Sequence, residues 1–268
     1  MNINKYITVT VALLSLFLLT SCEKEIEVDL NSAEPKLVIE GLVAADSLAT
    51  VRLTMSKDFN TNNIFEPVLG AIVSISDDKG NSEVLKINAS GIYAAKNLRG
   101  VPGHTYNLKV NVEGQEYTAS STMSPHTVKM DSITMYYIGL MDYAFPMVHF
   151  KDPSGTKNYY RDLVYINGKR HKLDEDVTDT DNREGFPMSR ILPIFKESNN
   201  DKEDPIKKGD TITVEHQLLD KGAYTFFETL GRISSSQTNP TTNIKGGALG
   251  YFSAYTCDRQ TVIADWSK

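Results

Sequence analysis

The chain has 268 residues, and its 34 acidic side chains outnumber its 28 basic ones to give a formal net charge of −6. A chain of this length forms one or two domains and can bury a sizeable core without disulfides. The acidic balance and the lack of a stripe of Lys and Arg argue against nucleic acid as a partner, because phosphate contacts require clustered positive charge.

Residues 1–21 have the features of a secretory signal peptide. Lys5 is the only charged side chain in this segment, and residues 7–19 are mostly apolar. The apolar run is too short for a transmembrane helix, which needs roughly 20 residues. Residues 19–22 read Leu-Thr-Ser-Cys, which resembles a bacterial lipobox, in which the cysteine is acylated and becomes the mature N-terminus. We therefore predict a lipid anchor at Cys22, the alternative being an ordinary signal peptide with an accidental cysteine.

An acidic leader, residues 22–35, follows the predicted anchor. Its charged side chains nearest the cysteine are Glu23, Lys24, Glu25, Glu27 and Asp29. One interpretation is a solvated spacer, because blocks of like charge stay extended. The position directly after the lipidated cysteine is similar to the surface-export signal of Bacteroidota lipoproteins. That resemblance implies an outer-membrane lipoprotein exposed at the cell surface, whereas a lipoprotein that faces the periplasm is the alternative.

Residues 36–125 predict an antiparallel β-sandwich. Apolar and polar side chains alternate in residues 106–112, which is the period of a half-buried strand. Glu113 and Gly114 then turn the chain into the next strand, and an Asp-Lys-Gly turn joins two earlier strands, with glycine supplying the positive φ that such turns need. Strands recur about every eight to twelve residues in this part of the chain, which is typical of a sandwich.

The same segment has a pattern of glycine, tyrosine and aliphatic positions. These positions are Gly91, Tyr93, Gly103, Tyr106, Leu108 and Val110. The pattern is similar to that of the carboxypeptidase-regulatory, transthyretin-like β-sandwich, an immunoglobulin-like module. The resemblance implies that the first domain has no catalysis of its own.

Residues 126–268 predict a second antiparallel β-sandwich-like domain, separated from the first by a break at Pro125. Asn167 and Gly168 form a two-residue hairpin signal between two of its strands. The apolar period then lengthens from two residues to three or four, so we predict one amphipathic helix near residues 221–236. We expect an aromatic stripe of this helix to pack on the second sheet. The stripe consists of Tyr224, Phe227, Leu230 and Ile233.

An acidic loop lies at residues 174–184, between expected strands. Its carboxylates are Asp174, Asp176, Asp179, Asp181 and Glu184. Such a group could gather around calcium, a hard cation that takes about six to eight oxygen ligands. The spacing departs from a calcium loop, because Arg183 stands where an oxygen ligand is needed and Gly185 comes late. We therefore predict a solvated loop without a metal, and no cofactor.

Three other candidates for chemistry are interpreted as structural. Once Cys22 carries lipid, Cys257 has no disulfide partner and is expected to be a small buried apolar residue. His149 and His216 lie inside predicted strands, and the apolar neighbours of His216 on one face favour a core position. The glycine-rich segment "KGGALG", residues 245–250, misses the spacing of a nucleotide loop and is expected to be a tight turn. A backbone shaped to touch a partner is the alternative for that segment.

The tail contains the most distinctive segment of the chain, "NPTTNIKGGALGYFSAYT" at residues 239–256. Together with "CEKEIEVDL", "LVIEGLV", "DSI" and "NYYR", it resembles an uncharacterised Bacteroidota lipoprotein family known as domain-of-unknown-function family 4249. The resemblance spans almost the whole mature chain. It implies a two-domain β protein on the outer membrane, often encoded beside a TonB-dependent transporter, and it implies no catalytic residues.

From these observations we predict a surface-exposed outer-membrane lipoprotein that is a non-catalytic binding or accessory subunit, with unidentified ligand-binding residues. Its expected partners are membrane lipid, through acylated Cys22, and a TonB-dependent nutrient transporter. A structural, assembly or adhesion lipoprotein of the cell envelope is one alternative. A cell-surface hydrolase is another, because carboxylate pairs form only in the folded chain. The chain has no His-Glu-x-x-His or Gly-x-Ser-x-Gly motif, so we predict that it is not an enzyme.

Overall fold

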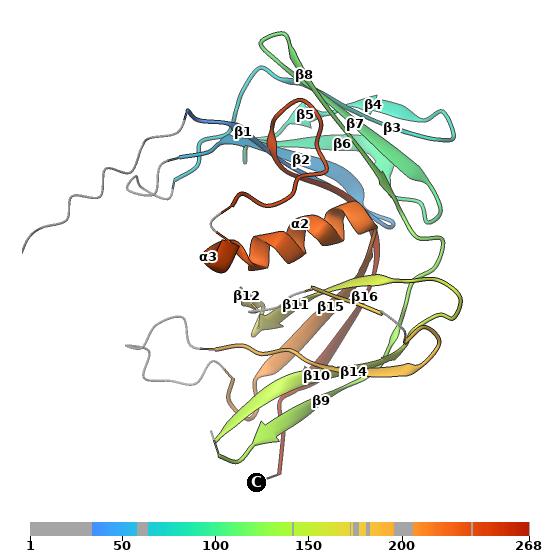
Figure 1. Ribbon diagram of the computed structural model, residues 1–268, viewed down its shortest axis with the longest axis vertical. Helices are drawn as coiled ribbons and strands as arrows, with labels where there is room; N and C mark the ends of the chain where they lie inside the picture. Colours follow the sequence, from blue (N-terminus) through green and yellow to red (C-terminus); the bar gives the residue numbers. More distant parts are fainter. Residues whose placement is uncertain are drawn as a thin grey trace, which may run out of the picture. The chain divides into compact units, whose positions relative to one another are not determined.

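The computed structural model describes residues 34–57, 64–140, 142–171, 173, 177–180, 183–195, 206–236 and 238–267. Within these residues the chain is mainly β, with several antiparallel sheets packed in the manner of a β-sandwich and a helical segment near residue 225 (Figure 1). The predicted fold class is therefore confirmed.

The first half of the described chain forms a sandwich of two sheets. Its strands are β1 (Leu37–Ala44), β2 (Leu48–Met55), β3 (Ile72–Asp77), β4 (Ser82–Val84), β5 (Lys86–Ile87), β6 (Ile92–Arg99), β7 (Thr105–Val112) and β8 (Gln115–Thr122). One sheet has the order β4-β3-β7-β8, and the other contains β1, β2, β6 and β5. Alternate side chains of both sheets, among them Ile39, Leu53, Ile75 and Leu108, form the core between them.

The second half contributes the remaining strands and the helices. They are β9 (Met130–Ile138), β10 (Tyr143–Lys151), β11 (Tyr159–Ile166), β12 (Lys169–His171), β13 (Val177–Asp179), β14 (Pro187–Ile191), β15 (Thr211–Leu219), α2 (Lys221–Gly231), α3 (Ile233–Ser236) and β16 (Leu249–Ile263). The three-stranded sheet β14-β10-β9 covers one face of β11 and β15. Phe150, Tyr160, Leu192 and Val214 are fully buried or nearly so in the core between these layers.

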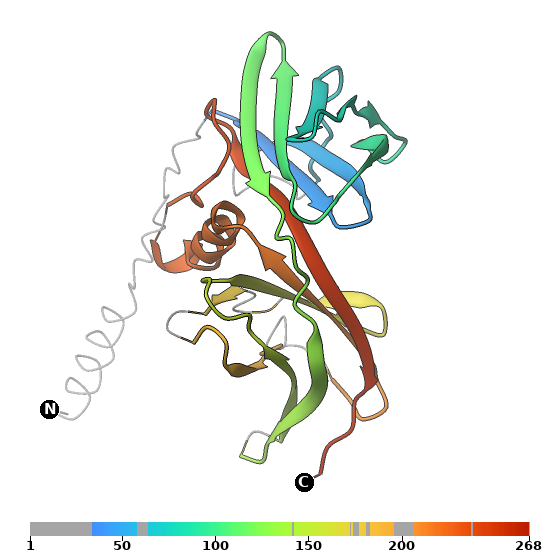
Figure 2. The same ribbon diagram turned by 90° about the vertical axis from the view of Figure 1, so that its right-hand side faces the viewer.

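One long strand, β16, joins the two halves into a nine-stranded sheet. The order of this sheet is β12-β11-β15-β16-β1-β2-β6-β5, and β13 also pairs with β11. The first part of β16 runs parallel to β1, and its second part runs antiparallel to β15. Figure 2 shows β16 as the red strand that passes from one half to the other. The parallel pair is an exception in a structure whose other strand pairs are antiparallel among the described residues.

The segment before β16 and the start of β16 itself each require a glycine. Gly246 and Gly250 have φ angles of 104° and 98°, which side chains rarely tolerate. A Cβ atom would lie 2.6 Å from the carbonyl oxygen of Glu116 at the first position and 2.0 Å from that of Ile39 at the second. The expected turn before the strand is therefore confirmed, and the close approach made by these glycines is to β8 and β1 of the same chain.

Two turn signals in the sequence are also confirmed. Asn167 and Gly168 have φ angles of 50° and 81° and connect β11 to β12. Glu113 and Gly114, at 51° and 89°, connect β7 to β8. Positive φ at both central residues is the geometry whose twist matches that of paired strands.

The helix forms where it was predicted, but its buried face differs from the predicted stripe. Ala223, Phe226 and Phe227 are the buried residues of α2, whereas Leu230 and Ile233 are exposed. Steps of three residues turn backwards around a helix by about 60° each, so a stripe at threes leaves the buried face within a few steps. The regular helix also ends at Gly231, before Ile233. The aromatic face packs on the nine-stranded sheet, where the ring of Phe227 lies under the guanidinium of Arg161 at 3.5 Å.

Candidate functional site

The predicted anchor and export signal lie outside the described residues. This applies to the signal peptide at 1–21, to Cys22 and to Glu23, Lys24, Glu25, Glu27 and Asp29. Within the described part of the chain, no helix has the length and apolar character needed to span a membrane. The anchor and the export signal therefore stay predictions from sequence.

The acidic loop is described only in part. Asp179 closes β13 and forms an ion pair with Lys157 at 2.9 Å, while Glu184 lies in the turn before β14. Asp174, Asp176 and Asp181 lie outside the described residues. Among the described side chains, no group of His, Cys, Asp and Glu is placed so that it could hold a metal ion. The prediction of a solvated loop rests on the sequence.

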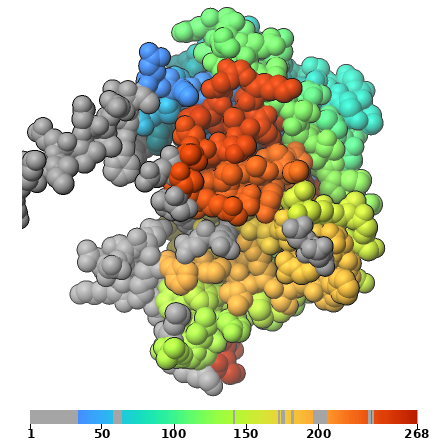
Figure 3. Space-filling view, viewed as in Figure 1, coloured from blue at the N-terminus to red at the C-terminus, as the bar shows by residue number. Residues whose placement is uncertain are grey.

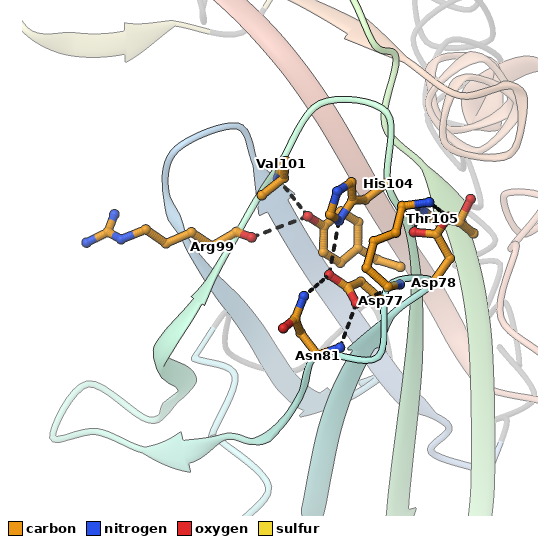
Figure 4. Close-up of polar contacts among 9 residues, drawn as sticks. Asp77, Asp78, Asn81, Arg99, Val101, His104 and Thr105 are labelled. Atoms are coloured by element: carbon orange, nitrogen blue, oxygen red, sulfur yellow. Dashed lines mark hydrogen bonds and ion pairs between the residues drawn. The ribbon is translucent and has the colours of Figure 1, made fainter.

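The structure brings together two Asp–His pairs that the sequence did not reveal. The first joins the β3–β4 turn to the β6–β7 connection, at one end of the first sandwich (Figure 4). The carboxylate of Asp77 accepts hydrogen bonds from the backbone N–H groups of Lys79 and Asn81, at 3.0 and 2.8 Å, and from the Asn81 side chain at 2.7 Å. The Nδ1 atom of His104 lies 3.0 Å from the same carboxylate.

These hydrogen bonds determine the protonation of Asp77. Burial raises the pKa of this carboxyl, but the hydrogen bonds from Asn81, His104 and Lys79 outweigh burial and lower the pKa to about 2. Asp77 is therefore ionised at neutral pH, and its acceptor positions are occupied by the turn that it closes. This arrangement indicates a turn-bracing role.

Tyr106 braces the adjacent connection. Its hydroxyl accepts a hydrogen bond from the backbone N–H of Val101 at 2.6 Å and lies 3.3 Å from the carbonyl oxygen of Arg99, to which it donates. Burial raises the pKa of Tyr106, so the hydroxyl keeps its proton for this bond. Figure 4 shows that these bonds and those of Asp77 hold neighbouring loops at the same end of the sandwich.

The second Asp–His pair lies in the core of the second half. Asp162 of β11 stands directly opposite His216 of β15, and the Nδ1 atom of His216 lies 2.7 Å from a carboxylate oxygen of Asp162. Arg190 of β14 reaches across the core to the other carboxylate oxygen, at 2.5 Å. Burial raises the pKa of Asp162, but His216 and Arg190 outweigh burial, and the pKa lies below its ordinary value.

Aromatic rings enclose this buried pair. The ring of His216 has its centroid 4.5 Å from that of Phe150 and 4.7 Å from that of Tyr160, on which it stacks. Tyr160 donates a hydrogen bond to Asp152, and burial followed by this carboxylate raises the pKa of Tyr160. Because His216 is only 1% exposed, its predicted core position is confirmed.

The geometry of Asp162 and His216 is relevant to the hydrolase alternative. A carboxylate bonded to Nδ1 of histidine is two-thirds of a nucleophilic triad, in which the Nε2 atom activates a hydroxyl or thiol. The Nε2 atom of His216 is buried and makes no hydrogen bond with any described residue. This pair therefore has no nucleophile within the described part of the chain, and its contacts indicate a core-bracing role.

A third carboxylate links the helix to both sheets. Asp220 caps the N-terminus of α2, where its side chain accepts a hydrogen bond from the N–H of Ala223 at 2.8 Å. The hydroxyl of Ser121, on β8, donates to the other oxygen of Asp220 and accepts from the N–H of Ala254, on β16, at 2.7 Å. Burial outweighs the hydrogen bonds in this case and raises the pKa of Asp220.

Cys257 is a free, half-buried thiol on β16. Burial, followed by the negative charges of Glu215 and Asp258, raises its pKa to about 11. The thiol is therefore protonated at neutral pH, which makes it a poor nucleophile. The second strand histidine, His149, bonds Thr134 and Ser189 through its two ring nitrogens, each at 2.8 Å.

The protein is mainly β, and the titratable clusters that the structure describes brace its turns, its core and a helix cap. The chain matches the family model described as "Domain of unknown function (DUF4249)" over residues 23–261. Because the match covers most of the chain, the chain belongs to this family, as its leader and tail motifs predicted. A comparison with curated proteins found no match.

Proposed function

We propose that this chain is a lipid-anchored outer-membrane protein of Bacteroidota, exposed at the cell surface, and a non-catalytic binding or accessory subunit of a TonB-dependent nutrient uptake system. The observation that carries the proposal is the lipobox at residues 19–22 followed at once by the acidic leader, in a chain of this family. Two or three acyl chains at Cys22 are sufficient for stable anchoring.

The accessory role is supported by how the described polar groups are used. The carboxylates of Asp77, Asp162 and Asp220 are all occupied by contacts that hold the scaffold together. A rigid sandwich that presents loops is suited to binding, because loops can vary without loss of the core. This combination favours a binding or accessory subunit over a surface hydrolase.

We also infer that residues 36–125 are a carboxypeptidase-regulatory-like module. The support is local: Tyr93, Tyr106 and Leu108 of the sequence pattern are all buried between the two sheets of the first half. Gly91 and Gly103 have φ angles of 74° and 85°, as turn glycines require.

Isolation from native membranes in mild detergent tests the proposed partner. We expect an outer-membrane transporter barrel to be retained with the wild-type chain. Recovery with envelope-assembly components alone would instead favour the structural alternative. A Cys22→Ser variant is the matched control, because it keeps the folded part and removes the acyl acceptor.

Protease treatment of intact cells tests the proposed exposure. We expect the wild-type chain to be cleaved without lysis. A variant in which Glu23, Glu25, Glu27 and Asp29 are replaced by serine should stay lipidated but become protected. Protection of the wild-type chain in intact cells, with cleavage after lysis, would show that it faces the periplasm.

A further inference from the structure

Exposed apolar side chains gather at one end of the first sandwich. We call them the tether-side patch, which consists of Met55, Ile64, Phe65, Leu69, Ile72, Val84 and Ile87. Leu69 is 70% exposed and Ile72 is 63% exposed, although both are large aliphatic residues. Large apolar side chains exposed on neighbouring segments in this way favour a place where a partner or a membrane binds.

Backbone pairing and hydrogen bonds connect the segments that carry most of these residues. Met55 closes β2 opposite Leu37 at the start of β1, and the following loop returns to β2 through a bond from the N–H of Val68 to the carbonyl oxygen of Leu53, at 2.9 Å. The same loop leads to Ile72 at the start of β3. Ile87 pairs with Tyr93, whose hydroxyl donates to the carbonyl oxygen of Val68 at 2.8 Å.

The described chain also begins at this end. The N–H of Lys36 donates to the hydroxyl of Ser56, and the N–H of Ser56 donates to the carbonyl oxygen of Lys36, each at 2.8 Å. The first described residues are therefore fastened beside the residue that follows Met55. In Figure 3 the blue surface at the start of the described chain adjoins light-blue surface of the first half.

The leader limits how far this end can lie from the anchor. Twelve residue steps at most about 3.6 Å long separate Cys22 from Glu34, so the two are within roughly 40 Å of each other. The tether thus holds the patch near the bilayer. We propose that the tether-side patch lies on the surface of the bilayer in which Cys22 is anchored, with its aliphatic side chains at the boundary between head groups and acyl chains. This inference rests on the proposed lipid anchor.

Charge around the patch indicates what kind of lipid surface it fits. Exposed basic residues on the segments around the patch include Lys36, Lys57, Lys86 and Lys109, and exposed acidic ones include Glu34, Glu66, Glu113 and Glu116, which pairs with Lys109. Because the two signs balance, the contact is apolar rather than electrostatic, and it does not require anionic lipid. The ammonium of Lys57 lies 5.9 Å from the ring centre of Phe65. The aliphatic part of the Lys57 side chain can therefore lie along the apolar surface while its charge stays in water.

The second half supplies a matched control surface. Leu140 is 99% exposed in the β9–β10 turn, in the other half of the described chain (Figure 1). It has the same side chain as Leu69 but lies far along the chain from the tether. A probe at residue 140 therefore measures the background contact with the membrane that any exposed leucine would make.

Fluorescence on vesicles tests the contact directly. The lipidated chain, with Cys257→Ser, receives a single polarity-sensitive label at Leu69→Cys or at Leu140→Cys and is bound to phosphatidylcholine vesicles. We expect head-group-level quencher lipids to quench the label at residue 69 at least about threefold more than the label at residue 140. Equal quenching at the two positions on vesicle-bound protein would overturn the patch contact. If mass spectrometry finds no lipid on Cys22 and the protein does not float with vesicles, the lipid anchor and the inference that rests on it are both overturned.

Release from vesicles is a second measurement that does not depend on labels. We expect the lipidated Leu69→Ser, Ile72→Ser double variant to leave vesicles about tenfold faster than wild type, because its patch loses apolar area. The lipidated Leu140→Ser variant should leave at the wild-type rate, and circular dichroism checks that both variants are folded. A photocrosslinker placed at residue 69 in native membranes should react with lipid. A crosslink to a protein instead would show that the patch binds a protein and would overturn the inference.

Discussion

The two halves of the molecule each contain an aspartate bonded to the Nδ1 atom of a histidine, but in opposite environments. Asp77 and His104 lie at a loop end, where backbone and side-chain N–H groups of the turn supply three of the four hydrogen bonds to the carboxylate. Asp162 and His216 lie in a core, where the guanidinium of Arg190 supplies a second partner for the carboxylate. Both carboxyl pKa values are lowered. The lowering at Asp77 comes chiefly from hydrogen bonds within a turn, whereas the lowering at Asp162 comes from His216 and Arg190.

The comparison shows that an aspartate bonded to a histidine can serve two structural purposes. At the loop end, the pair fixes the conformation of a short turn and leaves the core unaffected. In the core, removal of the carboxylate takes away the partner shared by His216 and Arg190, and this is the more costly change. The predictions below separate the two cases.

The largest effect is expected from Asp162→Ala. Loss of the carboxylate leaves Arg190 and His216 facing a buried space, so the free energy of unfolding should fall by about 3–5 kcal/mol. Urea denaturation measures this change. Asp131→Ala, an exposed aspartate of β9 in the same half, is the control and should change stability by no more than about 0.5 kcal/mol. A loss below about 1 kcal/mol for Asp162→Ala would show that the pair is not a brace of the core.

A companion variant sharpens the same point. The triple variant replaces Asp162 and His216 by leucine and Arg190 by methionine. It removes all three polar side chains at once, so none of them stays buried without its partner. Buried ionic groups replaced as a set by apolar residues are often neutral for stability. We therefore expect the triple variant to recover most of the stability lost by Asp162→Ala.

An intermediate effect is expected at Asp220, a buried carboxylate held by hydrogen bonds. Asp220→Ala removes the helix cap and the acceptor of Ser121, so stability should fall by about 1–2 kcal/mol. Asp220→Asn keeps an acceptor for the cap but loses the acceptor of the Ser121 hydroxyl, so it should lower stability at pH 7 by less than Asp220→Ala does. Because the folded pKa of Asp220 is raised, its contribution is present below the unfolded pKa and is lost as pH rises through the folded pKa. Urea unfolding at several pH values tests this slope, which Asp220→Asn should remove.

The smallest effect, with the opposite pH slope, is expected at Asp77. Its folded pKa of about 2 lies below the ordinary value of 3.8, so the unfolded state binds more protons between these values. Stability from Asp77 is present above about pH 4 and is lost as pH falls towards 2. We expect Asp77→Asn to lower stability at pH 7 by about 1 kcal/mol and to flatten the acid side of the stability curve. An unchanged acid slope in this variant would show that other carboxylates dominate.

Local signals in the sequence were sufficient for much of the fold. The alternating pattern located β7 and β15, and glycine placed the turns at residues 114 and 168, because both depend only on neighbours along the chain. The aromatic part of the helix stripe, Tyr224 and Phe227, packs on the sheet as predicted. Leu230 and Ile233 were placed wrongly, because counting by threes ignored the helical period of 3.6 residues. No local signal indicated that β16 would pair with β1, since the two strands lie far apart in sequence.

The polar clusters were harder to predict. His216 was placed correctly in the core by its apolar neighbours, but its partners were not, because Asp162 and Arg190 come from two other strands. One signal was present: Asp162 interrupts the otherwise apolar inward face of β11, and a buried carboxylate needs a partner. Which partner it finds depends on the packing of β14 across the core, which the sequence does not encode locally.

The position of β16 in the sheet has a consequence for how the chain folds as it is synthesised. Both halves contain this strand in their shared sheet, between β1 and β15, yet it is the last strand in chain order among the described residues. Neither half can complete its sheet until this late segment has been synthesised. The resulting long-range pairing is slow to form. We expect the nascent chain to remain without its final pairing until residues 249–263 have been synthesised.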